Sequence, residues 1–328
     1  MHRLIAVVLI AIVAFWCRIT PTHAGSPYSA LYAFGDSLSD VGSVFAISGG
    51  KEPAPPYFDG RFSNGPIWLD YLAARLGTGP MIPSSKLGGK DYAFGGATTG
   101  YAPTLSSPSL VPTLSQQVAL FNAATHGAAP SSALYAVWVG GEDLLNVLRS
   151  SATGAQAIQL MRGAAANEAT VIAALIRQGA RNFLVGLLPD AGKAPSITVF
   201  GPTVSAEASA LAAAYNIALV AHLSGVIASS GANVSYLDAF SLVDAAVADP
   251  GAFGLSNVTA PCYVGPFTGG GTVCATPDQY LFWDGTHPTT ASHAILAAEA
   301  ADVLCLSRKL ALAYCVQIIS NETDRQLW

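Results

Sequence analysis

Charged residues are scarce in this sequence, and the scarcity limits the possible partners. Of the 328 residues, 15 are Lys or Arg and 20 are Asp or Glu, so the formal net charge is -5. The basic residues form no stripe along the chain, and nucleic-acid binding depends on concentrated positive charge. We therefore expect no nucleic-acid partner. The apolar share of 52% predicts instead a globular protein with a sizeable core.

Cysteine is also rare, and its spacing does not indicate a metal site. The cysteines form no C-x-x-C pair and adjoin no histidine cluster, so we expect no bound metal. Cys262 and Cys274 bracket a glycine-rich loop that cannot hold its shape by packing, which predicts a disulfide between them. Cys305 and Cys315 would lie ~15 Å apart in one helix, beyond the ~7 Å that a disulfide allows. Their pairing stays open, because it requires a helix that ends between them.

Beyond the N-terminus, the sequence lacks a run with the length and polarity of a membrane span. Residues 4–16 are uniformly apolar, follow the basic start of His2 and Arg3, and are too short to cross a bilayer comfortably. A cleavage site of small residues ends at Ala24. We therefore interpret residues 1–24 as a secretory signal peptide, with an uncleaved anchor as the alternative. The mature protein would be secreted or periplasmic, without stable membrane insertion.

The rest of the chain lacks linkers and internal repeats. This predicts one domain over residues 25–305, followed by a tail of unknown role over residues 306–328. Strands are predicted at 30–34, 92–94, 134–139, 182–188 and 233–237, and helices at 67–76, 114–124, 155–178, 205–229 and 289–304. Because short apolar strands alternate with long helices, the pattern predicts an α/β fold whose parallel sheet is covered on both faces.

Two short motifs lie at opposite ends of this domain. Residues 282–288 read Phe-Trp-Asp-Gly-Thr-His-Pro, so Asp284 can orient the ring of His287 as a general base from the same turn. Gly35-Asp36-Ser37-Leu38 follows the first predicted strand, which places Ser37 at the sheet edge where ligands bind. Taken singly, Ser37 could be a turn or helix-capping residue, and the Asp-His pair a solvated loop.

Together the two motifs resemble those of the GDSL esterase/lipases in the SGNH hydrolase superfamily. The resemblance extends over residues 29–304 and implies a three-layer α/β/α sandwich with a central parallel sheet, a flavodoxin-like arrangement. The absence of a G-x-S-x-G motif argues against the α/β-hydrolase fold. The resemblance also implies a serine esterase or lipase in which Ser37 is the nucleophile, His287 the base and Asp284 its partner.

The reaction implied by this resemblance is hydrolysis of carboxylic esters through an acyl-enzyme, without a cofactor. Substrates would be small-molecule, lipid or polysaccharide esters, and we expect a monomer. Asp190 matches a strand-end motif of the family and is expected to shape a turn. His293 is expected to face away from the site.

One motif of this chain departs from the family pattern. Backbone N–H groups of Ser37 and Gly96 match the expected oxyanion donors, although Gly96 alone would be read as a turn glycine. The family carries Gly-x-Asn-Asp, whereas this chain has Glu142 at the position of the donating Asn. An ionised carboxylate cannot donate a hydrogen bond and repels an oxyanion, so Glu142 is a doubtful oxyanion residue. A degenerate member that binds acylated ligands or glycans is therefore the alternative, and an acyltransferase is a lesser one.

Overall fold

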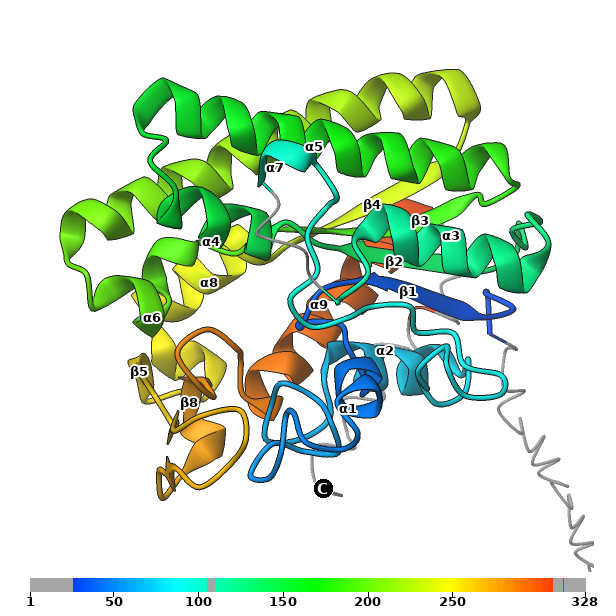
Figure 1. Cartoon of the computed structure of the whole chain (residues 1–328). Coiled ribbons are helices and arrows are strands. Elements are labelled where there is room, and N and C mark those ends of the chain that lie inside the picture. Colours follow the sequence, from blue (N-terminus) through cyan, green and yellow to red (C-terminus); the bar gives the residue numbers. More distant parts are fainter. Residues whose placement is uncertain (1–25, 105–109, 309–314, 316–328) are drawn as a thin grey trace, which may run out of the picture.

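The computed structural model describes residues 26–104, 110–308 and 315 (Figure 1). The predicted signal peptide at 1–24 lies outside the described residues, as does all of the predicted tail except 306–308 and Cys315.

A parallel sheet lies at the centre of the molecule. Within the described residues it has four strands in the order β1-β2-β3-β4. They are β1 (Leu31–Gly35), β2 (Leu134–Trp138), β3 (Asn182–Leu187) and β4 (Asn233–Asp238). All of β2 is buried, as expected for a strand covered on both faces.

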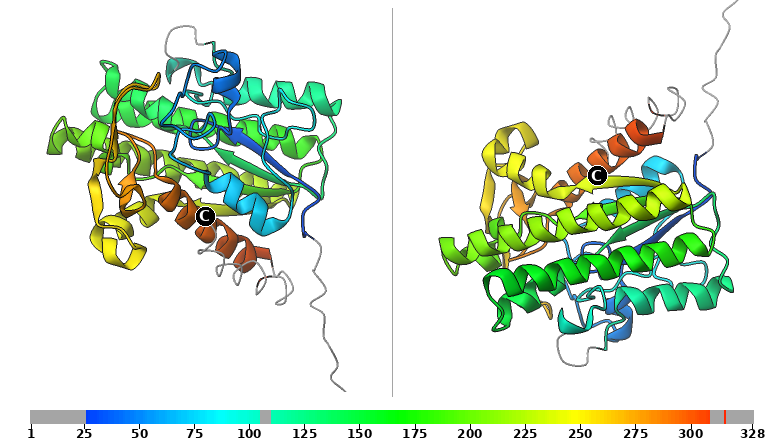
Figure 2. Two further views of the ribbon diagram at one scale, coloured as in Figure 1. Left: turned by 90° about the horizontal axis from the view of Figure 1, so that it is seen from below. Right: turned by 90° about the horizontal axis from the view of Figure 1, so that it is seen from above.

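Helices cover both faces of this sheet (Figure 2). One face carries α3 (Leu114–Thr125), α5 (Gly154–Arg177) and α7 (Pro202–Ser230); the other carries α2 (Trp68–Leu76) and α9 (Thr290–Arg308). Alternate side chains of each strand enter opposite cores, because the side-chain period of a strand is two. The prediction of a three-layer α/β/α sandwich is confirmed.

β2 shows this division of the core clearly. Tyr135 and Val137 join the core under α3, α5 and α7, whereas Leu134, Ala136 and Trp138 join the core under α2 and α9. A shift of one residue in register would place these side chains in the wrong layer. In the register observed, the carboxyl ends of β1 and β2 lie together, with Gly35 beside Trp138.

The segment predicted as a strand at 92–94 is not a strand. It lies beside β1 as an irregular extension, with the Tyr92 N–H donating to Ala33 at 2.8 Å and the Phe94 N–H donating to Gly35 at 3.1 Å. The N–H of Ala93, between these two donors, bonds to the buried Asp91 carboxylate at 3.0 Å and not to another strand. The extension still carries the chain to the sheet edge that holds Ser37.

Several shorter elements were not predicted. The helices among them are α1 (Ser43–Ile47), α4 (Gly141–Arg149), α6 (Pro195–Thr198) and α8 (Ala239–Ala248). The strands are β5 (Asn257–Pro261) paired with β8 (Tyr280–Phe282), and β6 (Tyr263–Val264) paired with β7 (Thr272–Val273). Most of them gather around the carboxyl end of the sheet in Figure 1.

Helix α7 corrects one sequence expectation. By length and composition it could cross a membrane, so the statement that no segment beyond the N-terminus has this character is wrong. The helix packs along α5, with Leu211, Tyr215 and Leu219 fully buried in the core. Core helices meet the same criterion, so the composition of α7 is weak evidence for a membrane span.

Candidate active site

Ser37 lies where β1 leaves the sheet. A Cβ atom at Gly35 would stand 2.0 Å from the Trp138 carbonyl oxygen, and the φ of Gly35 is +152°. Only glycine therefore fits at this crossing of β1 and β2. The N–H of Asp36 then bonds to the same Trp138 carbonyl at 3.3 Å, and the chain turns so that Ser37 follows directly at the sheet edge.

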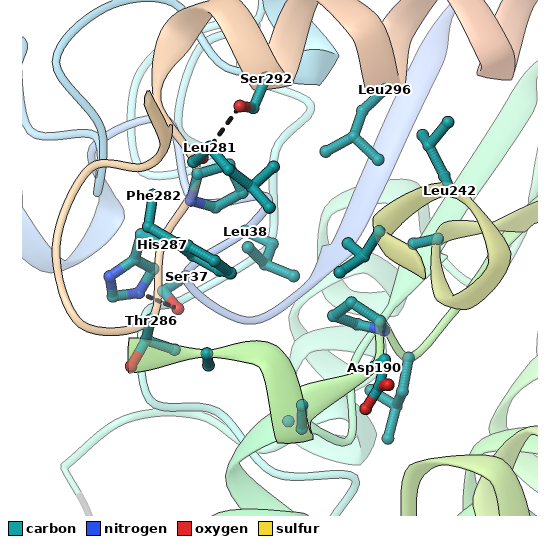
Figure 3. Close-up of a pocket in the computed structure, with 18 of the residues that line it drawn as sticks. Ser37, Leu38, Asp190, Leu242, Leu281, Phe282, Thr286, His287, Ser292 and Leu296 are labelled. Carbon is teal, nitrogen blue, oxygen red and sulfur yellow. Dashed lines mark hydrogen bonds between the residues drawn. The ribbon is translucent and has the colours of Figure 1, made fainter. Parts of the chain in front are cut away.

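The structure brings Ser37, His287 and Asp284 together. Nε2 of His287 lies 2.8 Å from Oγ of Ser37, as Figure 3 shows. Nδ1 of the same ring lies 2.7 Å from Oδ2 and 3.0 Å from Oδ1 of Asp284. Oδ1 of Asp284 also accepts the backbone N–H groups of Thr286 and His287, each at 2.8 Å. The turn thus fixes the carboxylate, and the carboxylate fixes the ring, as the spacing of the motif predicts.

Burial and charge shift the pKa values of Asp284 and His287 in opposite directions. Burial favours the neutral carboxyl, but the neighbouring His287 and the two N–H donors hold the pKa of Asp284 below its usual value. Burial also disfavours the imidazolium, yet the Asp284 carboxylate outweighs it and raises the pKa of His287 above 6.5. The protonated ring is therefore stabilised, which is the state that follows proton removal from a serine.

A third side chain holds Asp284 and was not predicted from the sequence. The hydroxyl of Tyr57 donates to Oδ2 of Asp284 at 2.7 Å, and Tyr57 is 3% exposed. Burial and the carboxylate raise the pKa of Tyr57, so its hydroxyl keeps its proton. The sequence gives no signal for this contact, because Tyr57 lies in a proline-rich loop 227 positions from Asp284.

Aromatic rings enclose the His287 side chain. The ring centroids of Phe62 and Phe267 lie 5.1 Å and 6.0 Å from that of His287. Phe62 and Phe267 also contact each other at 5.5 Å, and both contact Tyr57. These rings exclude water from one side of the imidazole, which strengthens its interaction with Asp284.

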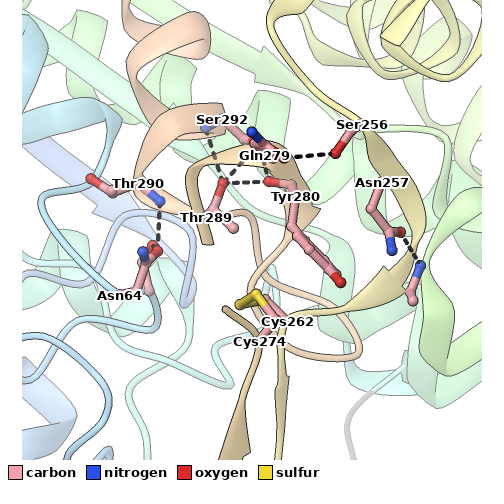
Figure 4. The surroundings of a disulfide bond; sticks show 12 residues. Asn64, Ser256, Asn257, Cys262, Cys274, Gln279, Tyr280, Thr289, Thr290 and Ser292 are labelled. Atoms are coloured by element: carbon pink, nitrogen blue, oxygen red, sulfur yellow. Dashed lines mark hydrogen bonds between the residues drawn. A yellow bond between two sulfur atoms is a disulfide. The ribbon is translucent and has the colours of Figure 1, made fainter. Parts of the chain in front are cut away.

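The loop that carries Phe267 is closed by a disulfide (Figure 4). The sulfur atoms of Cys262 and Cys274 are 2.04 Å apart, and they join the ends of the β6–β7 hairpin. The N–H groups of Cys262 and Tyr263 donate to the carbonyls of Phe282 and Trp283, at 3.0 and 2.6 Å. The hairpin therefore supports the backbone that immediately precedes Asp284.

The remaining two cysteines are free thiols. Cys305 lies in α9, and burial followed by the nearby Cys315 thiol raises the pKa of Cys305 to about 12. The two side chains are thus neighbours, although residues 309–314 between them are not described.

The predicted oxyanion residues Gly96 and Glu142 make fewer contacts than Ser37 and His287 do. Gly96 is exposed at a φ of +81°. Glu142, in the first turn of α4, lines the same cavity as Ser37 and makes no hydrogen bond with any described residue. Burial, with a smaller contribution from Glu142, raises the pKa of Asp36 to about 7. Two carboxyl groups, those of Asp36 and Glu142, therefore line the cavity beside Ser37.

Asp143, the residue after Glu142, has a different environment. Its carboxylate is fully buried and accepts the N–H and hydroxyl of Thr99 at 2.8 and 2.9 Å, together with the hydroxyl of Thr104. Burial outweighs these bonds and raises the pKa of Asp143 to about 6. Asp143 thus anchors the start of α4 to the chain that follows Gly96.

Asp190 and His293 occupy structural positions. Asp190 accepts the N–H of Gly192 at 3.0 Å and the hydroxyl of Ser209, and so shapes the turn after β3. His293 is 1% exposed in α9, and burial lowers its pKa to about 3. The hydrogen bonds of the Ser37 and Asp284 side chains to described residues do not involve it.

An apolar cavity opens beside Ser37 and His287. It holds about 1170 Å³ of empty space, including the solvent at its mouth. Figure 3 shows Ser37 and His287 on one side of it and Leu242 and Leu296 on the other. A bound molecule could therefore reach from the serine into the apolar interior.

The profile of the GDSL-like Lipase/Acylhydrolase family matches residues 31–300. The chain belongs to this family. It is 27% identical over 318 residues to a phosphatidylcholine-sterol acyltransferase of Aeromonas hydrophila, covering 84% of this chain and 89% of that protein. It is 31% identical over 320 residues to esterase EstA of Pseudomonas aeruginosa, covering 84% of this chain but only 47% of that protein.

Two further proteins are similar to this chain. An inactive GDSL esterase/lipase-like protein of Arabidopsis thaliana is 29% identical over 292 residues and covers 81% of this chain and 69% of its own length. The crystal structure of a phospholipase A1 from Streptomyces albidoflavus covers 85% of this chain and 99% of its own, with 19% identity and a TM-score of 0.41. The resemblance noted from the sequence is confirmed, and membership of the GDSL family supports an enzyme that acts on ester bonds.

Proposed function

We propose that the protein is a serine esterase or lipase that hydrolyses carboxylic esters through an acyl-enzyme. Oγ of Ser37 attacks the acyl carbon while Nε2 of His287 accepts the hydroxyl proton. The tetrahedral intermediate collapses, the alcohol leaves with that proton, and the acyl group stays on Ser37. Water then attacks the acyl-enzyme with His287 again as the base, which releases the carboxylic acid and restores Ser37.

One observation supports this proposal above the others. The hydrogen-bonded series from Ser37 Oγ through His287 to Asp284 is continuous, with contacts of 2.8 and 2.7 Å. Asp284 orients the ring and stabilises the imidazolium. The raised pKa of His287 has a consequence for the pH profile. Because the base must be neutral to accept a proton, kcat/KM should rise with pH through a value above 6.5.

The oxyanion donors belong to the proposal as well. The N–H groups of Ser37 and Gly96 would bind the developing oxyanion, and Glu142 would stand beside it. A single missing donor typically costs about 10²–10³ in rate. An enzyme slower than its fully equipped relatives is therefore expected.

Export is also proposed. Residues 1–24 would be removed as a signal peptide, and the mature monomer would act outside the cytoplasm, where the Cys262–Cys274 disulfide forms.

Two other functions remain to be separated from hydrolysis. The acyltransferase relative motivates the first, in which an alcohol replaces water in the second step. The position of Glu142 and the relative named as inactive motivate the second, a binding protein without turnover. Both predict measurable differences from an esterase.

Fluorophosphonate labelling of the purified full chain tests the proposal. We expect labelling of Ser37 that disappears in Ser37→Ala and persists in Ser224→Ala, a matched control on the exposed face of α7. Ester hydrolysis should follow the same order. A folded wild-type protein that takes no label and cleaves no ester would contradict the proposal and favour the binding protein. Ester formation with an added alcohol, faster than acid release, would favour the acyltransferase.

A further inference from the structure

A second groove on the surface adjoins the turn that carries Asp284 and His287. It is formed by α4, α6 and the start of α7, and it holds about 820 Å³ of empty space, including open solvent. Its apolar side chains are those of Leu145, Leu148, Ile197, Phe200 and Val204. Thr286 also lines it, and Oγ1 of Thr286 lies 3.1 Å from Oγ of Ser196 in α6. Because Thr286 and Ser196 line the cavity beside Ser37 as well, the groove and that cavity are neighbours.

The segment between α6 and α7 exposes two large apolar side chains at this groove. Val199 is 74% exposed and Phe200 is 71% exposed. Residues 194–206 include no charged residue, so no ionised side chain of this segment would have to leave water on docking. The β6–β7 hairpin also exposes an apolar ring near the turn, since Phe267 is 43% exposed and its ring centroid lies 6.0 Å from that of His287. Exposed apolar clusters of this kind mark surfaces that contact a membrane or another protein.

One positive charge accompanies the apolar side chains. Arg149, at the end of α4, is exposed and carries the only charge among the described residues that line the groove. The ion pairs between described residues do not include Arg149. A guanidinium binds phosphate through charge-assisted, bidentate hydrogen bonds. An apolar tip beside an available guanidinium is therefore complementary to a phospholipid surface, where phosphate groups lie above acyl chains.

The charge of the whole chain favours one kind of phospholipid. Its formal net charge is -5, so a strongly anionic membrane would repel the molecule. A zwitterionic surface offers the same phosphate group to Arg149 without a net charge. The place of the groove favours lipid over a protein partner, because an ester that leaves a lipid surface here would enter the neighbouring cavity beside Ser37 directly.

Resting on the proposed function, we propose that Val199, Phe200 and Arg149 form a docking patch for the surface of a zwitterionic phospholipid such as phosphatidylcholine. The two apolar side chains enter the acyl region, and the guanidinium of Arg149 donates to a phosphate oxygen. Docking brings the mouth of the cavity beside Ser37 to the lipid, so that an ester reaches the serine without crossing water.

Co-sedimentation with phosphatidylcholine vesicles tests the docking patch without turnover. In the Ser37→Ala protein, the double substitution Val199→Ser, Phe200→Ser should weaken vesicle binding about tenfold or more, because the burial of two large apolar side chains is lost. Ile217→Ser is the matched control. Ile217 is 72% exposed, but it lies about 22 Å along α7 from Pro202.

Arg149→Gln tests the phosphate contact. It should weaken vesicle binding about two- to fivefold, since exposed ion pairs contribute little. Arg177→Gln is the control, because Arg177 is exposed at the opposite end of α5. Every variant carries the same apolar segment at 4–16, so differences between variants report the docking patch alone.

Turnover provides a second readout in proteins that keep Ser37. The rate for an ester embedded in phosphatidylcholine vesicles is divided by the rate for a soluble acetyl ester. This ratio should fall about tenfold in the double variant, in step with its vesicle binding, and should stay constant in Ile217→Ser.

Several outcomes would overturn the inference. They are a folded Ser37→Ala protein that binds no vesicles, an equal loss in Ile217→Ser and the double variant, and equal binding to phosphate-free triacylglycerol droplets with no effect of Arg149→Gln. Self-association that the double variant abolishes, without vesicle binding, would assign the docking patch to a second copy of the chain. In each case the proposed function stands if wild type cleaves the soluble ester and Ser37→Ala does not. If neither ester is cleaved and Ser37 takes no fluorophosphonate, while vesicle binding still depends on Phe200, the proposed function fails and the docking surface stands.

Discussion

At the scale of single residues, Asp284 is the most heavily supported group in the site. Its Oδ2 atom accepts from both His287 and Tyr57, and its Oδ1 atom accepts from two backbone N–H groups. Four donors therefore hold the carboxylate in its orientation. Under the proposed mechanism Tyr57 would act on the chemistry through Asp284, as a positioning residue.

Tyr57→Phe should lower kcat by about tenfold, because a hydrogen bond to a charged group is worth about 1.5–3 kcal/mol. The lost donor leaves more negative charge on Oδ2, so the pKa of His287 should rise further. The acid limb of the pH profile of kcat should then move to higher pH. Steady-state kinetics across pH measure both effects.

Tyr263→Phe is the control for this substitution. Tyr263 belongs to the same buried aromatic cluster, but its hydroxyl donates to the Pro266 carbonyl at 2.8 Å and not to Asp284. It should leave the pH profile in place. A Tyr57→Phe protein with unchanged kcat and unchanged profile would show that the contact has no role in positioning.

Glu142→Asn should raise kcat. Glu142 lines the same cavity as Ser37, where an ionised carboxylate would repel the developing oxyanion, whereas Asn can donate a hydrogen bond. The gain belongs to kcat because the oxyanion exists only during reaction. If the variant is slower at every pH, Glu142 contributes to catalysis and the departure from the family pattern is no defect.

At the scale of elements, the β6–β7 hairpin supports the turn of Asp284 and His287. Its backbone donors contact Phe282 and Trp283, and its loop presses Phe267 against His287. The loop is also tied to the N-terminal part of the chain, since the Ala54 N–H donates to the Phe267 carbonyl at 2.7 Å. Loosening the hairpin should therefore affect both stability and turnover.

The double variant Cys262→Ala, Cys274→Ala should lose about 2–4 kcal/mol in free energy of unfolding, the usual contribution of a disulfide. Its kcat should also fall, since Phe267 no longer holds His287 firmly. Denaturant unfolding and ester hydrolysis measure the two effects. A reducing agent should change the wild-type protein in the same direction and leave the double variant unchanged. Peptide mapping that finds both thiols free after oxidative folding would refute the disulfide.

At the scale of the whole molecule, the fold could be predicted further than the site. The strands at 134–139, 182–188 and 233–237 were predictable because short apolar runs between long helices have few alternative uses. The short helices α4 and α8 were missed because they follow strands directly and are held by tertiary packing. The segment at 92–94 was predicted as a strand because it is apolar and does bond to β1, and the apolar pattern does not show that the Ala93 N–H bonds to Asp91.

The candidate site could likewise be predicted only in part. The approach of Asp284 to His287 follows from their spacing, and that of Ser37 follows from parallel-sheet geometry. Tyr57, Phe62 and Phe267 could not be predicted, because their contacts depend on how irregular loops pack. The cavity could not be predicted either, since its walls come from segments far apart in sequence.

The stability of the whole molecule should depend on its buried acids. Burial raises the pKa of five carboxyl groups whose residues are at most 3% exposed: Asp36, Asp40, Asp91, Asp143 and Glu168. Such groups hold their protons more tightly in the folded protein than in the unfolded chain. Their contribution to the free energy of unfolding is therefore complete below the pKa of the unfolded state, and it is lost as pH rises through the pKa of the folded state. His293 has the opposite effect on the free energy of unfolding, but only below pH 6.5, where the histidine becomes charged in the unfolded chain.

Between pH 6.5 and about 8.5, His293 is neutral in both the folded and the unfolded protein. Over this interval the free energy of unfolding should therefore fall as the pH rises. Asp36, with a pKa of about 7, titrates within this window. Denaturant titrations at a series of pH values would measure the slope. Glu168→Gln should make the slope shallower, and a stability that climbs over this interval would contradict the expectation.

Because 250 positions separate Ser37 from His287, the two residues are synthesised at different times. A ribosome makes Ser37 before His287, so a growing chain carries the serine hydroxyl without its proposed base until the segment of His287 has been made. Under the proposed mechanism, fragments that stop before residue 287 would not hydrolyse esters. Activity would begin only when the segment that carries Asp284 and His287 docks against Ser37.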